Sequence, residues 1–135
     1  MQLIRAGGHL VKGEFAVNHR DFHRFIWPQA ATQDFLGQWI LEILKRDNWW
    51  MMVSNGNRDS KMESGWDDAV PVGRAYVEVA PDRIIWSTDW PHPMWSKRMM
   101  NDAEEVELLY RYVDNDPSLL QRILVDNPVR LHGFG

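Results

Sequence analysis

The sequence predicts an α/β domain in which parallel strands alternate with helices. Residues 49–53 form a short, continuously apolar run between turn-forming residues, as is typical of a buried parallel strand, and residues 83–88, with the apolar core Ile84-Ile85-Trp86, are a second predicted strand. Segments with apolar residues at helical spacing precede or separate these runs. The second run ends at Asp89, with His92 between two prolines just beyond, and α/β enzymes place reactive groups at the carboxyl ends of their strands.

Composition limits the class of protein. The 135 residues suit one domain, residues 1–135, with 44% hydrophobic and 25% charged residues. The net charge of −4 argues against a nucleic-acid partner. No stretch approaches the roughly 20 apolar residues of a membrane span, and the start lacks the apolar core of a signal peptide, so we expect a cytoplasmic protein. Without cysteine, a metal would need histidine and carboxylate ligands.

The first half of the chain is predicted to contain a strand end, a loop, a helix and a strand. Residues 3–4 form an apolar run before Gly7 and Gly8. An aromatic-rich loop is expected at residues 11–31, and long loops in compact domains are often functional. Thr32 can cap a helix that extends to about residue 46, and the strand at residues 49–53 follows.

The second half is predicted to alternate in the same way. After a polar loop, a helix is expected from Asp67 to about residue 80, then the strand at residues 83–88. Two further helices are predicted, one capped by Asp102 and one starting at Asp116-Pro117. Asn127-Pro128 is expected to end the last of them.

Three segments resemble the amidohydrolase-2 family, most closely its 2-pyrone-4,6-dicarboxylate lactonase-like branch. Residues 80–93, APDRIIWSTDWPHP, resemble the last barrel strand, and residues 124–134, LVDNPVRLHGF, resemble the terminal helix and tail. Residues 49–58, WWMMVSNGNR, resemble the penultimate strand with its following arginine. The resemblance implies the C-terminal part of a (β/α)8 TIM barrel of the metal-dependent hydrolase type. The His-x-His pair of that family's first strand does not occur in this sequence.

The resemblance assigns Asp89 the activation of the hydrolytic water, and a carboxylate can also ligate a divalent metal. The competing interpretation of Asp89 is a turn residue before Pro91. His9 is the nearest match to a histidine at the end of the sixth barrel strand, so His9 and Asp89 are the candidate ligands for a divalent metal such as zinc. Whether a metal is bound stays open, because the lactonase-like branch is thought to act without a tightly held ion.

Two further residues are candidate substrate ligands. Arg58 can clamp a substrate carboxylate, or it can be a solvated loop residue paired with Asp59. His92 can orient substrate by donating a hydrogen bond, or it can bond to the backbone of its own loop. His19 and His23 have metal-ligand spacing but lack a helical context, so loop or packing roles are favoured.

The leading hypothesis is therefore a hydrolase that acts on an ester or lactone bond of a small carboxylated ring compound. A metal-dependent aromatic-acid decarboxylase of the same family is the first alternative. The second is a truncated, non-catalytic half-barrel. A half-barrel exposes a strand edge that another copy usually covers, which predicts a homo-oligomer.

Overall fold

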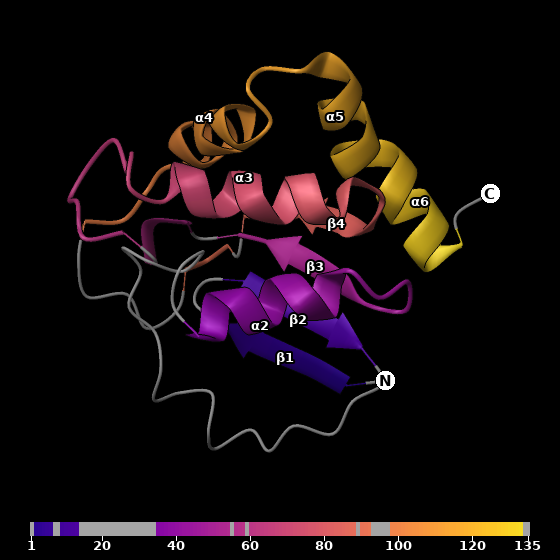
Figure 1. Ribbon diagram of the computed structural model, residues 1–135. Coiled ribbons are helices and arrows are strands. Elements are labelled where there is room, and N and C mark those ends of the chain that lie inside the picture. The colour runs from indigo at the N-terminus through magenta and orange to yellow at the C-terminus, as the bar shows by residue number, and fades with distance from the viewer. Residues whose placement is uncertain are drawn as a thin grey trace.

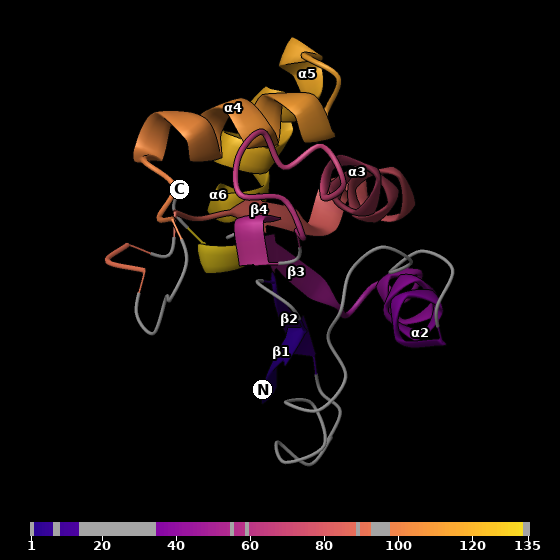
Figure 2. The same ribbon diagram turned by 90° about the vertical axis from the view of Figure 1, so that its left-hand side faces the viewer.

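The computed structural model describes residues 2–6, 9–13, 35–54, 56–58, 60–88, 90–92 and 98–133, and side chains from residue 37 onward. Its sheet has four strands in the order β1 (Gln2–Ala6), β2 (His9–Gly13), β3 (Trp50–Val53) and β4 (Ile84–Trp86). Helices α2 (Phe35–Leu44) and α3 (Val70–Val79) lie on the same side of this sheet (Figures 1 and 2). None of the helices described is long and apolar enough to cross a membrane.

The expectation of parallel pairing throughout is wrong for the described strands. β3 and β4 are parallel, but β1 pairs with β2 antiparallel and β2 pairs with β3 antiparallel. β1 and β2 are separated by two residues, and parallel strands need a crossover of roughly a dozen residues or more. Gly7-Gly8 between two apolar runs was a hairpin signal that the sequence interpretation missed.

The parallel pair is formed by the two strands that the sequence predicted most clearly. Both are short and mostly buried, and Met51, Val53 and Ile84 are fully enclosed. α3 connects them, starting with a proline in its first turn and continuing into η2 (Pro81–Arg83) before β4. This is the strand–helix–strand unit in which both strands end at the same edge of the sheet.

Helix α4 (Asp102–Tyr112) packs against α3 and against the chain that follows β3. A Cβ at Gly73 would overlap the ring of Tyr112, and a Cβ at Gly56 would overlap Tyr112 and Leu108. Only glycine permits these close approaches. The cap of α4 is Asn101 and not Asp102 as expected: its side chain accepts from the Glu104 amide at 2.9 Å.

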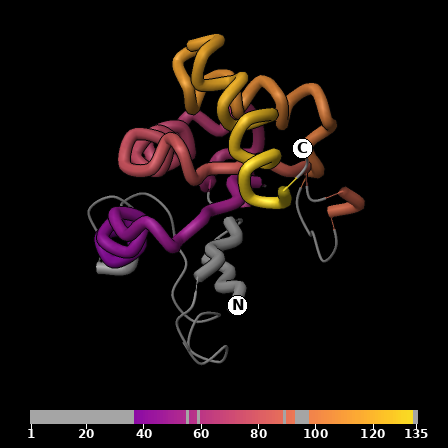
Figure 3. Tube along the Cα trace, turned by 90° about the vertical axis from the view of Figure 1, so that its right-hand side faces the viewer, coloured from indigo at the N-terminus to yellow at the C-terminus, as the bar shows by residue number. Residues whose placement is uncertain are grey.

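The C-terminal helices follow one another without a break (Figure 3), and their later part packs against β4. α5 (Pro117–Gln121) is capped by Asp116, as expected, and continues through the π-helical segment η3 (Arg122–Asp126) into α6 (Asn127–His132). The prediction that Asn127-Pro128 ends the helix is wrong. A proline ring collides with the carbonyl four residues earlier in a regular α-helix, and the wider π turn before Pro128 relieves that collision.

Candidate active site

The candidate site lies at the carboxyl ends of β3 and β4. Parallel pairing sets Met51 opposite Ile84 and Val53 opposite Trp86. The Ser87 amide then donates to the Val53 carbonyl at 3.3 Å, which extends the pairing beyond β4. The segments that carry the predicted site residues therefore leave the sheet side by side.

Arg58 follows β3 at this edge. It is the last residue of η1 (Gly56–Arg58) and is half-buried. Asn57 before it is buried, and Gly56 is in close contact with α4. η1 is thus held against the body of the protein, and Arg58 lies on the strand end that the sequence predicted.

The segment after β4 carries Asp89 and His92. Asp89 lies outside the described residues, as do His19 and His23, so the structure does not test these residues. His92 is buried, follows the cis Trp90–Pro91 peptide, and has a φ of 55°. Trp90 is 76% exposed.

His9 lies at the same edge of the sheet, but on a strand of a different type from the one predicted. It was predicted at the end of a parallel barrel strand, but it is the first residue of the antiparallel strand β2. The register sets Leu10 opposite Met52, so the backbone of His9 lies by the carboxyl end of β3. The strand type predicted for His9 is wrong, and its predicted edge of the sheet is retained.

Glu105 is a residue that the sequence interpretation did not single out. Glu105 is 3% exposed, and its Oε1 lies 3.7 Å from Nδ1 of His92. It shares the buried side of α4 with Leu108, Leu109 and Tyr112. An acid at helical spacing from three core residues was the available signal, because carboxylates are rarely buried without a role or a partner.

A small cavity opens between α4 and the two strand ends. Its volume of about 10 Å³ is close to that of a single water probe. It is lined by residues from the segment after β3, from β4, and from α4 and the chain just before it: Ser54, Gly56, Trp86, Met100, Glu105, Leu108 and Tyr112. The cavity thus joins the edge that carries Arg58 to the side chain that contacts His92.

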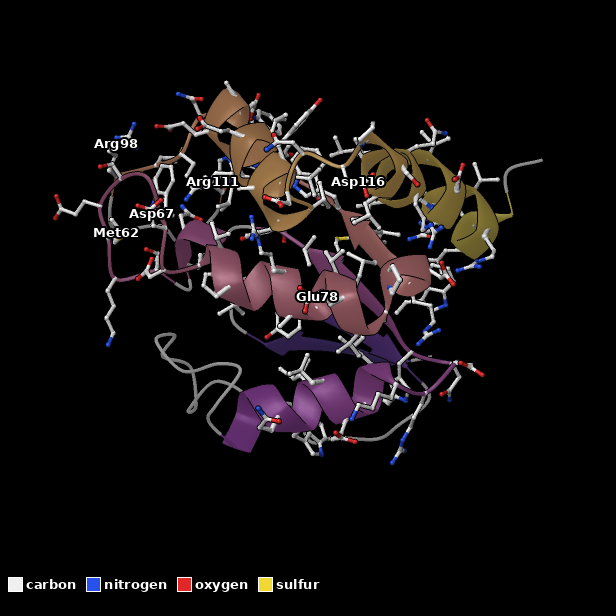
Figure 4. All side chains as sticks on the ribbon, turned by 45° about the horizontal axis from the view of Figure 1, so that its top comes forward. Met62, Asp67, Glu78, Arg98, Arg111 and Asp116 are labelled. Carbon is white, nitrogen blue, oxygen red and sulfur yellow. The ribbon has the colours of Figure 1, made fainter. Side chains whose placement is uncertain are left out.

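Charged groups hold the loop of residues 65–67, before α3, in contact with α4 (Figure 4). Arg111 of α4 donates to the Asp67 carboxylate and to the Gly65 carbonyl. Arg98 lies 5.5 Å from the centre of the Trp66 ring and pairs with Glu104 at 2.6 Å. The hydrogen bond from Arg98, followed by that from the Asn101 amide, holds the pKa of Glu104 below its ordinary value. These contacts fix the start of α4, which carries Glu105.

Within the part of the chain whose side chains are described, no three histidine, aspartate or glutamate side chains gather as a metal site would require. His92 and Glu105 supply two such groups. The predicted ligands His9 and Asp89 are not among the described side chains. The described donors alone do not fit a divalent metal site, so no chemical step is derived through one.

Comparison with known proteins shows which family the chain resembles. A family model described as amidohydrolase matches residues 27–134. A 4-sulfomuconolactone hydrolase of Hydrogenophaga intermedia is 38% identical over 96 residues, which cover 70% of this chain and 31% of the relative. A 2-pyrone-4,6-dicarboxylate hydrolase of Comamonas testosteroni is 40% identical over 70 residues, or 52% of this chain and 23% of the relative.

The fold has a counterpart among solved structures. An apo crystal structure of an Agrobacterium tumefaciens protein superposes with a TM-score of 0.65 at 27% sequence identity, covering 77% of this chain and 37% of that one. The chain spans about a third of the length of the curated lactone hydrolase from Hydrogenophaga. The region that the family model matches, residues 27–134, includes both parallel strands and the described helices from α2 onward.

Proposed function

The chain belongs to the amidohydrolase family, and from that premise we propose that it forms part of a lactone hydrolase. The observation that carries the proposal is the similarity of the chain to two kinds of hydrolase, one named for a lactone and one for a pyrone. The parallel pair β3–β4, with a half-buried arginine and a buried histidine beyond its carboxyl end, is consistent with it. We further propose that the complete fold is a TIM barrel to which this chain contributes the C-terminal part.

The proposed reaction is the attack of water on the carbonyl carbon of a lactone. Asp89 takes a proton from the water as the new C–O bond forms, and the ring C–O bond then breaks. The leaving oxygen receives the proton that Asp89 took from the water, so the product is a ring-opened hydroxy acid or its keto tautomer. The place of Asp89 in the sequence, three residues after the end of β4, supports this role, because strand ends are where barrel enzymes hold catalytic groups.

Arg58 and His92 are proposed to bind a substrate that carries a carboxylate or a similar anionic group. An arginine can bind a carboxylate through two parallel hydrogen bonds. A histidine can donate to the oxygen on which negative charge develops. Both residues follow strands that end at the same edge of the sheet, which supports their assignment to one site.

The test is an assay of the 135-residue protein with 2-pyrone-4,6-dicarboxylate and with 4-sulfomuconolactone. We expect ring opening without release of carbon dioxide. Asp89→Asn should reduce kcat by about 10²-fold or more, the lower end of general-base contributions. Asp102→Asn, which removes an exposed carboxylate at the start of α4, is the matched control and should retain activity.

Three outcomes would contradict the proposal in different ways. Release of carbon dioxide from an aromatic acid would favour the decarboxylase alternative. Full activity of Asp89→Asn would remove Asp89 from the mechanism. Absence of turnover by the natural protein on both compounds would favour the non-catalytic half-barrel.

A further inference from the structure

We propose that Glu105 is a positioning residue that holds the imidazole of His92 at the site. The inference deepens the proposed lactone hydrolase function and rests on it for the effect on turnover. The two side chains come from segments that are distinct in sequence, the turn after β4 and the first turn of α4, and they meet at 3.7 Å between Nδ1 and Oε1.

The burial of Glu105 calls for a specific reason. Its side chain is 2% exposed, on the side of α4 that also carries Leu108 and Leu109. Transferring a carboxylate out of water is costly unless a charged or hydrogen-bonding group compensates for the lost hydration. The imidazole of His92 is such a group, and it is itself 6% exposed.

His92 is held by its backbone as well as by its ring. Its φ of 55° is in the left-handed region, which few residues other than glycine adopt, although histidine is among those enriched there. Residues in this region persist where the surrounding structure fixes them, and they cluster at functional sites. The backbone directs the ring into the protein, and Glu105 then lies on its Nδ1 side.

The contact determines which ring nitrogen remains for the substrate. A carboxylate at Nδ1 favours the tautomer with hydrogen on Nδ1, which leaves Nε2 for the substrate. Neutral imidazole then accepts at Nε2, so the donation to the substrate oxygen proposed above requires the protonated ring, which carries hydrogen on both nitrogens. The distance of 3.7 Å is longer than a hydrogen bond, and such contacts are often long without substrate and shorten when it binds.

Glu105 is also close to the strand ends where the substrate is proposed to bind. It lines the small cavity together with Ser54 after β3 and Trp86 of β4. Glu105 therefore connects a rigid helix, fixed by the Asn101–Glu104 capping box, to the loop that carries His92. This is the arrangement expected of a group that orients a substrate-binding histidine.

The activity test uses Glu105→Leu, which removes the acceptor at similar volume, and Glu105→Gln, which keeps an acceptor oxygen. We expect Glu105→Leu to lower kcat by about 10- to 100-fold with little change in KM, and Glu105→Gln to restore most of it. In a His92→Ala background, Glu105→Leu should have no further effect, because Glu105 acts through His92. Glu107→Leu on the exposed side of α4 is the control.

A second measurement does not depend on turnover. Nitrogen-15 NMR of the histidine rings, with His92 assigned by its absence in His92→Gln, reports the tautomer. We expect hydrogen on Nδ1 in the natural protein and in Glu105→Gln, and a shift toward Nε2 in Glu105→Leu. If the natural protein has no lactonase activity, the proposed function fails, and the NMR result still decides whether Glu105 positions His92.

Two results would overturn the inference. One is an unchanged His92 tautomer in a folded Glu105→Leu variant. The other is a loss of activity in Glu105→Gln as large as in Asp89→Asn that persists in the His92→Ala background, because Glu105 would then act on the substrate or the water directly.

Discussion

Asn127 shows how much one polar side chain can connect in this protein. It is 2% exposed, and its side-chain amide donates to the Pro81 carbonyl at 2.8 Å and to the Ile84 carbonyl at 2.6 Å. Arg130, one turn later, donates to the Asp82 carbonyl. α6 is thereby joined to the segment that leads into β4, and so to the strand that carries the candidate catalytic loop.

Replacing Asn127 with alanine should destabilise the protein. Two buried carbonyl groups would lose their donor, so we expect the free energy of unfolding to fall by about 1–3 kcal/mol. Equilibrium unfolding in urea measures this change in the free energy of unfolding. Asn48→Ala, in the exposed turn after α2, is the control and should change the free energy by less than about 0.5 kcal/mol. Equal values for the two variants would show that the Asn127 contacts contribute nothing.

At the residue scale, the sequence indicated Arg58, Asp89 and His92 as candidate site residues from their positions after predicted strands. Arg58 and His92 do lie by the carboxyl ends of β3 and β4. Glu105 could not be assigned in the same way, because it lies on a helix and its role depends on which loop meets that helix. Such contacts between segments distant in sequence are decided by tertiary packing.

At the scale of elements, α4 illustrates why helix boundaries are difficult to predict. Asn101 and Asp102 are both common N-cap residues, and the sequence alone does not choose between them. The structure selects Asn101, because the Glu104 carboxylate then accepts a hydrogen bond from the Asn101 amide at 3.0 Å. Arg98 adds an ion pair to the same carboxylate.

The capping carboxylate predicts a pH-dependent stability. Glu104→Gln should lower the free energy of unfolding at neutral pH by about 0.2–1 kcal/mol, the range of exposed ion pairs. Since folding lowers the pKa of Glu104, its contribution is complete above the unfolded-state pKa and is lost as the pH falls through the folded-state pKa.

Thermal or urea unfolding of both proteins between neutral and acidic pH measures this dependence. Glu107→Gln removes a carboxylate from the exposed side of the same helix and should have the smaller effect at neutral pH. A difference between natural protein and Glu104→Gln that stays constant into acid would argue against the capping role.

At the scale of the whole molecule, the sheet has two outer strands, β1 and β4. β2 pairs with β3 on one side of the parallel pair, and β1 pairs with β2. On that side, β1 is therefore the strand with the open edge that was predicted for a half-barrel. Strand edges present unpaired amide and carbonyl groups that readily pair with another chain. We therefore retain the prediction of a homo-oligomer.

Light scattering coupled to size-exclusion chromatography tests that prediction. We expect a mass of at least twice 15.9 kDa that decreases on dilution. A monodisperse species of 15.9 kDa at all concentrations would be evidence against self-association.

The sequence by itself indicated α2, α3, α4 and α5, the two parallel strands, and the positions of the candidate site residues after those strands. These features depend on apolar periodicity and on prolines and caps, which act over a few residues. The tertiary structure decided the antiparallel pairing of β2 with β3, the continuation of the last helix through Pro128, and the meeting of Glu105 with His92. Each of these depends on which distant segments pack together, and the free energy of that packing is not encoded in any single stretch of the chain.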